Sequence, residues 1–310
     1  MDDAKNYPGD IRMPGKKKEN IKEDYNLKPS DFNTSRRPTW CTGCGNFGIW
    51  NAMKKAFIKL SLYPHQVLAV YGIGCSGNGV NFLKTYSFHS LHGRTLPVAT
   101  GAKIANHKMV VLAISGDGDG MGIGGNHFIH SCRRNINITN IVHDNHVYGL
   151  TTGQTSPTSG LGFKSKSTPS GVLETPVNPI SLALAAGATF VARGFSGDIG
   201  QLGEIIRKAI KHRGFSFVDI LQPCVTFNKI DSYEHYREKI YSIDTIKDYN
   251  RADLRNAFQI SLEEEKIPTG IFYQVQKPIY EDGLKQIDRK PLIDHIVSDI
   301  DMNKLFNRYY

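Results

Sequence analysis

The sequence predicts a doubly wound α/β fold built on a mostly parallel β-sheet. Short apolar runs alternate along the chain with longer amphipathic stretches. The apolar runs contain few polar residues, as expected of strands that are covered on both faces. Strands and helices in alternation form parallel sheets with right-handed crossovers. The 310 residues, 40% of them hydrophobic, are enough to bury the core of such a domain.

Five strands and three helices are expected in the central part of the chain. The strands are expected at residues 67–74, 109–119, 138–145, 188–194 and 215–223. The helices are expected at residues 46–62, 124–136 and 199–214. In the last helix the apolar residues repeat with a helical period, at Leu202, Ile205, Ile206, Ala209 and Ile210.

The chain divides into three parts. Residues 1–36 are polar and charged without periodicity, and we expect them to form an N-terminal extension. Residues 37–227 contain all the expected strands and helices and should form the α/β domain. Residues 228–310 are polar with scattered aromatic residues. We expect a C-terminal extension there that packs on the core or on a partner.

Composition argues against several classes of protein. The net charge is +9, but the basic residues are scattered, so no nucleic-acid partner is expected. No apolar run approaches the roughly 20 residues that span a membrane, and the N-terminus lacks the apolar centre of a secretory signal. Five cysteines are sparse and odd in number, which favours metal binding or buried thiols over a disulfide framework. We therefore expect a cytoplasmic protein that does not associate with membranes.

A glycine-rich loop, "GDGDGMGIGGNHF", follows the second expected strand. Gly116 and Gly118 fall where the strand must turn and present backbone N–H groups to an anion at the start of the next helix. Asp117 and Asp119 would repel a diphosphate alone, but a divalent cation between carboxylate and diphosphate removes the conflict. Asp119 has the alternative role of a turn-forming or helix N-terminal acid.

The next expected strand ends at Asn145, one crossover after Asp117, so both residues should lie at the same edge of the sheet. The Asp117 carboxylate, the Asn145 side-chain oxygen and a backbone carbonyl near Val147 can supply three oxygens to Mg²⁺. This pattern resembles the thiamine diphosphate signature of the enzymes that depend on that cofactor. The alternatives are an unrelated nucleotide site and a purely structural turn.

Four of the five cysteines should meet at this edge of the sheet. Cys41 and Cys44 form a CxxC pair before the first helix, whereas Cys75 and Cys224 follow the first and last expected strands. Four thiolates suit either zinc or a [4Fe–4S] cluster, and two single cysteines beside a reactive cofactor favour electron transfer. Taken singly, Cys75 or Cys224 would be an ordinary core residue. Cys132, within a helical pattern, is expected to be a free buried thiol.

The chain from residue 38 to 227 resembles the β subunit of 2-oxoacid:ferredoxin oxidoreductases. The resemblance rests on "WCTGCGNFG", "GIGCSG", "SGDGDGMGIGGNHFIHSCRRNINIT", "DNHVYGLTTGQTSPTS" and "QPCVTFN", and "IPTGIFYQVQKPIYE" also fits. The motifs "LHGR" and "GLTTGQTSPTS" are most similar to the 2-oxoglutarate branch, with pyruvate as the alternative substrate.

The resemblance implies the oxidative decarboxylation of a 2-oxoacid to acyl-CoA and CO₂, with electrons passing through one [4Fe–4S] cluster to ferredoxin. It implies that the cluster is bound by Cys41, Cys44, Cys75 and Cys224. It also implies that Asp117, Asn145 and the carbonyl of Val147 hold Mg²⁺. A glutamate on an α subunit would complete the thiamine diphosphate site. We therefore expect a chain that is inactive alone and works as an α/β heterodimer or a dimer of heterodimers.

The expected cofactor-binding residues come from the three loops at the strand ends. They are Gly74, Cys75, Ser76, Gly116, Asp117, Gly118, Asp119, Asn145, Val147, Gly149, Leu150 and Thr151. His92 and Arg94, in "SFHSLHGR", are candidate catalytic residues because they could bind a substrate carboxylate or a cofactor phosphate. Alternatively, they only cap and pack a helix that begins near Thr95.

Two other functions are consistent with parts of this pattern. A non-oxidative thiamine diphosphate decarboxylase or carboligase would keep Asp117 and Asn145 but need no cluster. An electron-transfer or scaffolding subunit would keep the four cysteines but not the cofactor.

Overall fold

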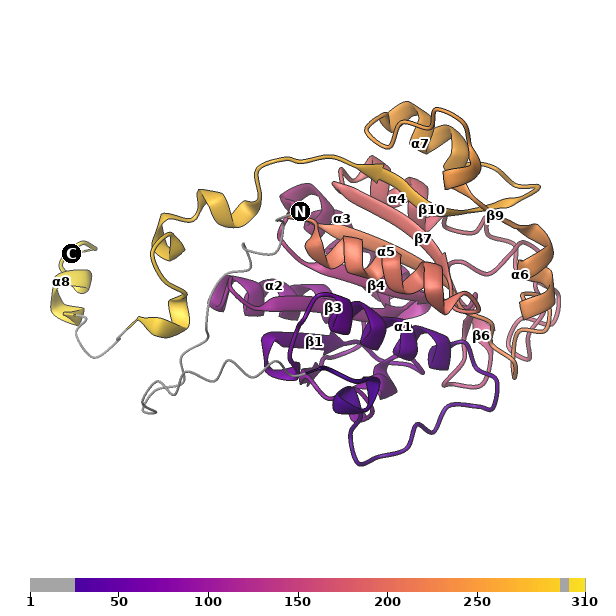
Figure 1. Ribbon diagram of the computed structural model, residues 1–310, viewed down its shortest axis with the longest axis horizontal. Helices are drawn as coiled ribbons and strands as arrows, with labels where there is room; N and C mark the ends of the chain where they lie inside the picture. Colours follow the sequence, from indigo (N-terminus) through magenta and orange to yellow (C-terminus); the bar gives the residue numbers. More distant parts are fainter. Residues whose placement is uncertain (1–25, 296–300, 310) are drawn as a thin grey trace.

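The computed structural model describes residues 26–295 and 301–309, and its central feature is an eight-stranded sheet (Figure 1). The strands stand in the order β2-β1-β3-β4-β8-β7-β10-β9, and all neighbours are parallel except β7 and β10. Their bounds are β1 (Val67–Tyr71), β2 (Tyr86–His89), β3 (Val110–Gly116), β4 (Thr139–Asp144), β7 (Phe190–Phe195), β8 (Ser216–Leu221), β9 (Ile240–Ser242) and β10 (Ile267–Gln274). The predicted mostly parallel sheet is confirmed.

Helices cover both faces of the sheet. On one face α1 (Asn46–Lys59) and α5 (Ile199–Lys211) lie side by side (Figure 1). On the other face lie α2 (Thr95–Ala105), α3 (Gly125–Arg134), α4 (Pro179–Ala185) and α7 (Leu254–Ser261). Each face has its own apolar core, and successive residues of one strand serve the two cores in turn: Leu112 and Ile114 contact the first, Val111 and Ala113 the second.

The remaining elements are short. A two-stranded hairpin of β5 (Val147–Tyr148) and β6 (Gln154–Thr155) stands beside the main sheet. The other helices are α6 (Tyr233–Lys239), α8 (Met302–Phe306) and one π-helical turn, η4 (Gly118–Ile123). The 3₁₀ turns are η1 (Pro29–Phe32), η2 (Pro64–Gln66), η3 (Gly77–Asn81), η5 (Ile243–Thr245), η6 (Tyr280–Gly283), η7 (Lys285–Ile287) and η8 (Leu292–Asp294). Within the described residues, none of the helices has the length and apolar character needed to cross a membrane.

All five expected strands and all three expected helices are present, each shorter than the sequence pattern indicated, and β7 ends one residue later than expected. The helix considered at Thr95 is α2, whereas β2 was not anticipated. All four residues of β2 are exposed at the edge of the sheet, so the sequence there lacks the apolar run that marks the buried strands.

The two ends of the chain contribute more to the core than their composition suggests. Residues 1–25 of the expected N-terminal extension lie outside the described residues, but Phe32 is fully buried and packs against Phe57 of α1. After residue 228, β10 adds a buried strand to the main sheet, with a register shift between Ile271 and Tyr273. The sequence pattern missed this strand because Pro268 and Gly270 interrupt it.

Candidate active site

The carboxyl ends of β1, β3, β4 and β8 meet at one edge of the sheet, and the segments that follow them line a cavity of about 200 Å³. Every residue of the expected cofactor-binding set lines this cavity, as does His92. His143, Tyr148 and Gln222 also line it, although none of them was expected to. Arg94 does not line the cavity: its side chain is exposed before α2 and donates a hydrogen bond to the His92 carbonyl.

The turn after β3 brings backbone and side chains into very close contact. Gly118 lies under the ring of Tyr148, and a Cβ atom at this position would stand 2.2 Å from the ring. The Tyr148 hydroxyl donates a 3.0 Å hydrogen bond to the Gly118 carbonyl. Glycine is therefore required here by this contact, which holds the hairpin of β5 and β6 against the start of η4.

Replacing Gly118 with alanine should destabilise the protein by about 1–3 kcal/mol, because the added methyl group must displace the Tyr148 ring. Thermal unfolding would measure the loss. Gly125→Ala is the matched control, since a Cβ atom there meets no neighbouring atom within 4 Å and alanine favours the helix. Equal melting temperatures for the two variants would contradict the steric argument.

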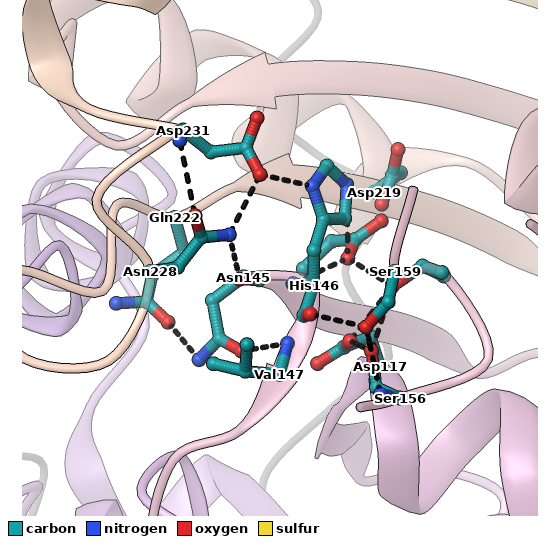
Figure 2. Close-up of polar contacts among 12 residues, drawn as sticks. Asp117, Asn145, His146, Val147, Ser156, Ser159, Asp219, Gln222, Asn228 and Asp231 are labelled. Atoms are coloured by element: carbon teal, nitrogen blue, oxygen red, sulfur yellow. Dashed lines mark hydrogen bonds and ion pairs between the residues drawn. The ribbon is translucent and has the colours of Figure 1, made fainter. Parts of the chain in front are cut away.

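The Asp117 carboxylate is buried at the base of the cavity. Its Oδ2 accepts hydrogen bonds from the hydroxyls of Ser156, at 2.5 Å, and Thr158, at 2.7 Å, and no hydrogen bond between described residues uses Oδ1 (Figure 2). Burial, and then the nearby Asp144 carboxylate, raise the pKa of Asp117 to about 7. An additional positive charge at Oδ1 would stabilise the ionised form, as expected for a residue that binds a cation.

The side chain of Asn145 is oriented by its neighbours (Figure 2). Its Nδ2 donates to Gln222 Oε1 at 2.8 Å, and its Oδ1 accepts the backbone N–H of Val147 at 3.1 Å. Its carbonyl accepts a 3.1 Å hydrogen bond from the side-chain amide of Asn228. The amide oxygen of Asn145 therefore lies on the side of Val147, where the sequence predicts the Mg²⁺ ligands.

His146 fixes the turn that follows β4. Its backbone adopts a left-handed conformation with φ of 60°, and its imidazole contacts two carboxylates: Asp231 at 2.8 Å and Asp144 at 3.5 Å. Burial alone would lower the pKa of His146, but these two carboxylates outweigh burial and raise it well above its ordinary value. His146 thus ties the end of β4 to the segment that follows β8 (Figure 2).

Apart from Nδ1 of His92, which lies 2.8 Å from the Asp119 carboxylate, two buried polar atoms on the cavity wall have no hydrogen-bond partner among the described residues. They are the Ser76 hydroxyl and Nε2 of His143. Burial lowers the pKa of His143 to about 3, so its imidazole is neutral, and its Nδ1 lies 2.8 Å from Asn46 Oδ1. Buried polar atoms are rarely left without a partner, so these two indicate a polar ligand in the cavity.

Both carboxylate oxygens of Asp119 make contacts within the protein. Its Oδ1 accepts the backbone N–H groups of Ile73 and Gly93, at 3.0 and 2.8 Å, and lies 2.8 Å from Nδ1 of His92. Its Oδ2 accepts a hydrogen bond from the Thr95 hydroxyl at 3.2 Å. Asp119 therefore joins the segments that follow β1 and β2.

A second cavity, of about 230 Å³, is lined by all four of the expected cysteine ligands. A Cβ atom on Gly149 would stand 3.5 Å from Cys75 Sγ and 3.7 Å from Cys224 Sγ, so both sulfurs face this glycine. Burial, together with the neighbouring thiols, raises the pKa of Cys44 to about 12 and that of Cys75 to about 11. Thiolates at this site therefore need a positively charged group to stabilise them.

The four cysteines reach this cavity from three separate segments of the chain. Cys41 and Cys44 precede α1, Cys75 follows β1 and Cys224 follows β8. In the described part of the chain, no group of three or more His, Cys, Asp or Glu residues is arranged to hold a single metal ion. What lies beside the cysteines bears on the choice between zinc and a cluster.

The cofactor cavity and the cysteine cavity share one wall. The residues that line both are Cys75, Asn145, Gly149, Leu150 and Gln222. The fifth cysteine, Cys132, is fully buried in α3 and lines neither cavity. Four of the cysteines therefore stand directly beside the cavity that the expected cofactor residues line.

Known proteins share this sequence and fold. Residues 64–220 match the family "Thiamine pyrophosphate enzyme, C-terminal TPP binding domain", and residues 224–289 match the C-terminal region of the pyruvate ferredoxin oxidoreductase beta chain. A 2-oxoacid:ferredoxin oxidoreductase subunit beta from a Sulfolobus species is 46% identical, over 79% of this chain and 85% of its own length. This chain belongs to that family of β subunits. The family resemblance seen in the motifs is thereby confirmed.

Two further relatives of this β subunit are named for 2-oxoglutarate. The 2-oxoglutarate synthase subunit KorB of Methanocaldococcus jannaschii is 39% identical, over 81% of this chain and 93% of its own. The solved structure of the 2-oxoglutarate:ferredoxin oxidoreductase from Magnetococcus marinus, with 2-oxoglutarate, coenzyme A and succinyl-CoA bound, has a TM-score of 0.85 and 39% identity. The match covers 93% of this chain and 98% of that one.

The sequence pattern did not reveal several side chains that shape the site of this β subunit. Ser156 and Thr158 lie in the motif "GLTTGQTSPTS", Gln222 and Asn228 are the two ends of "QPCVTFN", and His143 precedes Asn145 by two residues. All of them stand near motifs that were recognised. Their roles depend on which side chains meet across the sheet edge, and a single sequence does not contain that information.

Proposed function

We propose that this β subunit, joined to an α subunit, carries out the oxidative decarboxylation of 2-oxoglutarate to succinyl-CoA and CO₂, with one [4Fe–4S] cluster passing electrons to ferredoxin. One 2-oxoglutarate, one coenzyme A and two oxidised ferredoxins give succinyl-CoA, CO₂, two reduced ferredoxins and one proton. The bond between the keto carbon and the carboxylate of 2-oxoglutarate breaks and CO₂ is released. The electron pair of this bond passes to the two ferredoxins one electron at a time. The sulfur of coenzyme A forms a C–S bond with the former keto carbon, and the thiol proton is released.

The cofactor cavity supports the first half of this proposal. Thiamine diphosphate, when bound, supplies the electron sink that decarboxylation of a 2-oxoacid requires. Asp117, Asn145 and the Val147 carbonyl would hold Mg²⁺ against the diphosphate, since they line one side of the cavity and offer oxygen atoms. The unpartnered Ser76 hydroxyl and His143 Nε2 would contact the polar part of the cofactor.

The shared wall is the observation that carries the oxidative reaction. Four cysteines line a cavity directly beside the cofactor cavity, so a [4Fe–4S] cluster held there would be close enough to accept electrons. A non-oxidative decarboxylase would not need the cysteine cavity. A subunit that only transfers electrons would not need the cofactor cavity that Asp117 lines. The four cysteines are free thiols, which also favours a reducing compartment such as the cytoplasm.

The substrate is proposed from the relatives, two of which are named for 2-oxoglutarate. Purification of the α/β complex without oxygen would test the whole proposal. We expect brown protein with about four iron atoms per β chain, bound thiamine diphosphate, and fastest ferredoxin reduction with 2-oxoglutarate in a panel of 2-oxoacids. Colourless protein would contradict the cluster, and faster turnover of pyruvate would contradict the substrate.

The α subunit is expected to be essential. The described residues of this chain form one large sheet, and the family resemblance places the glutamate that contacts the aminopyrimidine of the cofactor on the partner. The β subunit alone, supplied with thiamine diphosphate, Mg²⁺ and 2-oxoglutarate, should therefore release no measurable CO₂. Addition of separately purified α subunit should restore release, and turnover by β alone would contradict this prediction.

A further inference from the structure

Gln222 stands between the two cavities and lines both. It follows the last residue of β8, where its backbone N–H donates to the Asp144 carbonyl at 2.8 Å and extends the pairing of β4 with β8. The residue is 1% exposed. A Cβ atom on Gly45 would lie 2.8 Å from Gln222 Cγ, so the segment that carries Cys41 and Cys44 presses directly on this side chain.

The amide of Gln222 makes hydrogen bonds toward both cavities. Its Oε1 accepts from Asn145 Nδ2 at 2.8 Å. Its Nε2 donates to Cys44 Sγ at 3.3 Å and to the Pro223 carbonyl at 2.9 Å. Among the residues that line both cavities, Gln222 is the one whose side chain bonds both an expected Mg²⁺ ligand and an expected cluster ligand.

The orientation of this amide follows from its surroundings. The Pro223 carbonyl is an acceptor only, so the NH₂ group must face it and the neighbouring sulfur. The oxygen of Gln222 is then left facing Asn145, which must present its own NH₂ group in return. As a result the Asn145 oxygen points away from Gln222, toward Val147, where it can bind a cation. A reversed Asn145 would present N–H groups to the cation instead.

We propose that Gln222 is a positioning residue that serves both halves of the site. It orients Asn145 for the Mg²⁺ that accompanies thiamine diphosphate, and it raises the reduction potential of the cluster by donating a hydrogen bond to the Cys44 sulfur. The proposal rests on the function proposed above. Hydrogen bonds to cluster sulfurs favour the reduced, more negative state, and partners that orient a metal ligand contribute strongly to metal affinity.

The test uses the anaerobically purified α/β complex with Gln222→Met, which has a similar volume but neither hydrogen bond. We expect the midpoint potential of the cluster, followed by electron paramagnetic resonance during a redox titration, to become more negative. We expect Mg²⁺ affinity in the presence of thiamine diphosphate, measured by titration calorimetry, to fall roughly 10- to 100-fold. Gln222→Glu keeps an acceptor for Asn145 and should restore most of the Mg²⁺ affinity.

Gln259→Met, on the exposed side of α7, is the matched control and should change neither quantity. The wild-type complex is measured first, and absence of iron or of cofactor binding there would refute the proposed function itself. If the wild type binds both groups but Gln222→Met leaves the potential and the affinity unchanged, the role of Gln222 is refuted and the function stands. Loss of the cluster from both Gln222 variants would also refute it, since Gln222 would then be a purely structural residue.

Discussion

Replacing Cys224 with serine is expected to remove the iron-sulfur cluster from the α/β complex while thiamine diphosphate and Mg²⁺ still bind. Cys224 lines the cysteine cavity, but it is absent from the lining of the cofactor cavity. A serine hydroxyl is a poor substitute for a thiolate ligand to iron. Iron content should fall from about four atoms per chain toward zero, and ferredoxin reduction by 2-oxoglutarate should be lost.

The matched control is Cys132→Ala, since Cys132 is buried in α3 and lines neither cavity. Iron content, the absorbance of the cluster and the binding of thiamine diphosphate are measured for both variants under anaerobic conditions. The Cys132 variant should keep its iron. Wild-type iron content in the Cys224 variant would remove this cysteine from the ligand set, and loss of thiamine diphosphate binding would show that the two halves of the site do not load independently.

The sequence was sufficient to predict the parts of the fold that are buried on both faces. The runs at β1, β3, β4, β7 and β8 contain apolar residues on both faces of the strand, because these strands lie in the interior of the sheet, and the polar residues of β4 and β8 are buried as well. The edge strand β2 and the interrupted strand β10 lack this pattern, so the width of the sheet was underestimated. Strand order was not predictable from the runs alone, since it depends on which strands the crossovers bring together.

The loops of the site were predictable because parallel strands bring their carboxyl ends to one edge. Asp117, Asn145 and Cys224 follow three different strands, and the structure places all three at that edge. Two details required the structure. Arg94 belongs to the same motif as His92, but its side chain is exposed. The orientation of the Gln222 amide depends on its hydrogen bonds to Cys44 and Pro223, and no local sequence pattern indicates it.

Replacing Asp117 with asparagine is expected to abolish high-affinity binding of Mg²⁺ and thiamine diphosphate without destabilising the protein. The substitution removes the negative charge that a cation at Oδ1 would neutralise. The loss of affinity should exceed the roughly 100-fold effect of removing a group that only orients a metal ligand. Titration calorimetry of the anaerobic α/β complex would measure it, with Asp198→Asn as the control because that residue caps α5 outside both cavities.

Thermal unfolding without cofactor distinguishes this loss from a general failure to fold. Burial and the Asp144 carboxylate raise the pKa of Asp117 to about 7, so at pH 8 its ionised form is unfavourable in the cofactor-free protein. A neutral asparagine of the same shape relieves this cost, and the Asp117→Asn complex should melt at the same temperature as the wild type or higher. A cation ligand is expected to favour binding at the expense of stability in the empty site. A lower melting temperature for the variant would therefore contradict the role of Asp117. Wild-type affinity of the variant for Mg²⁺ and thiamine diphosphate would contradict it as well.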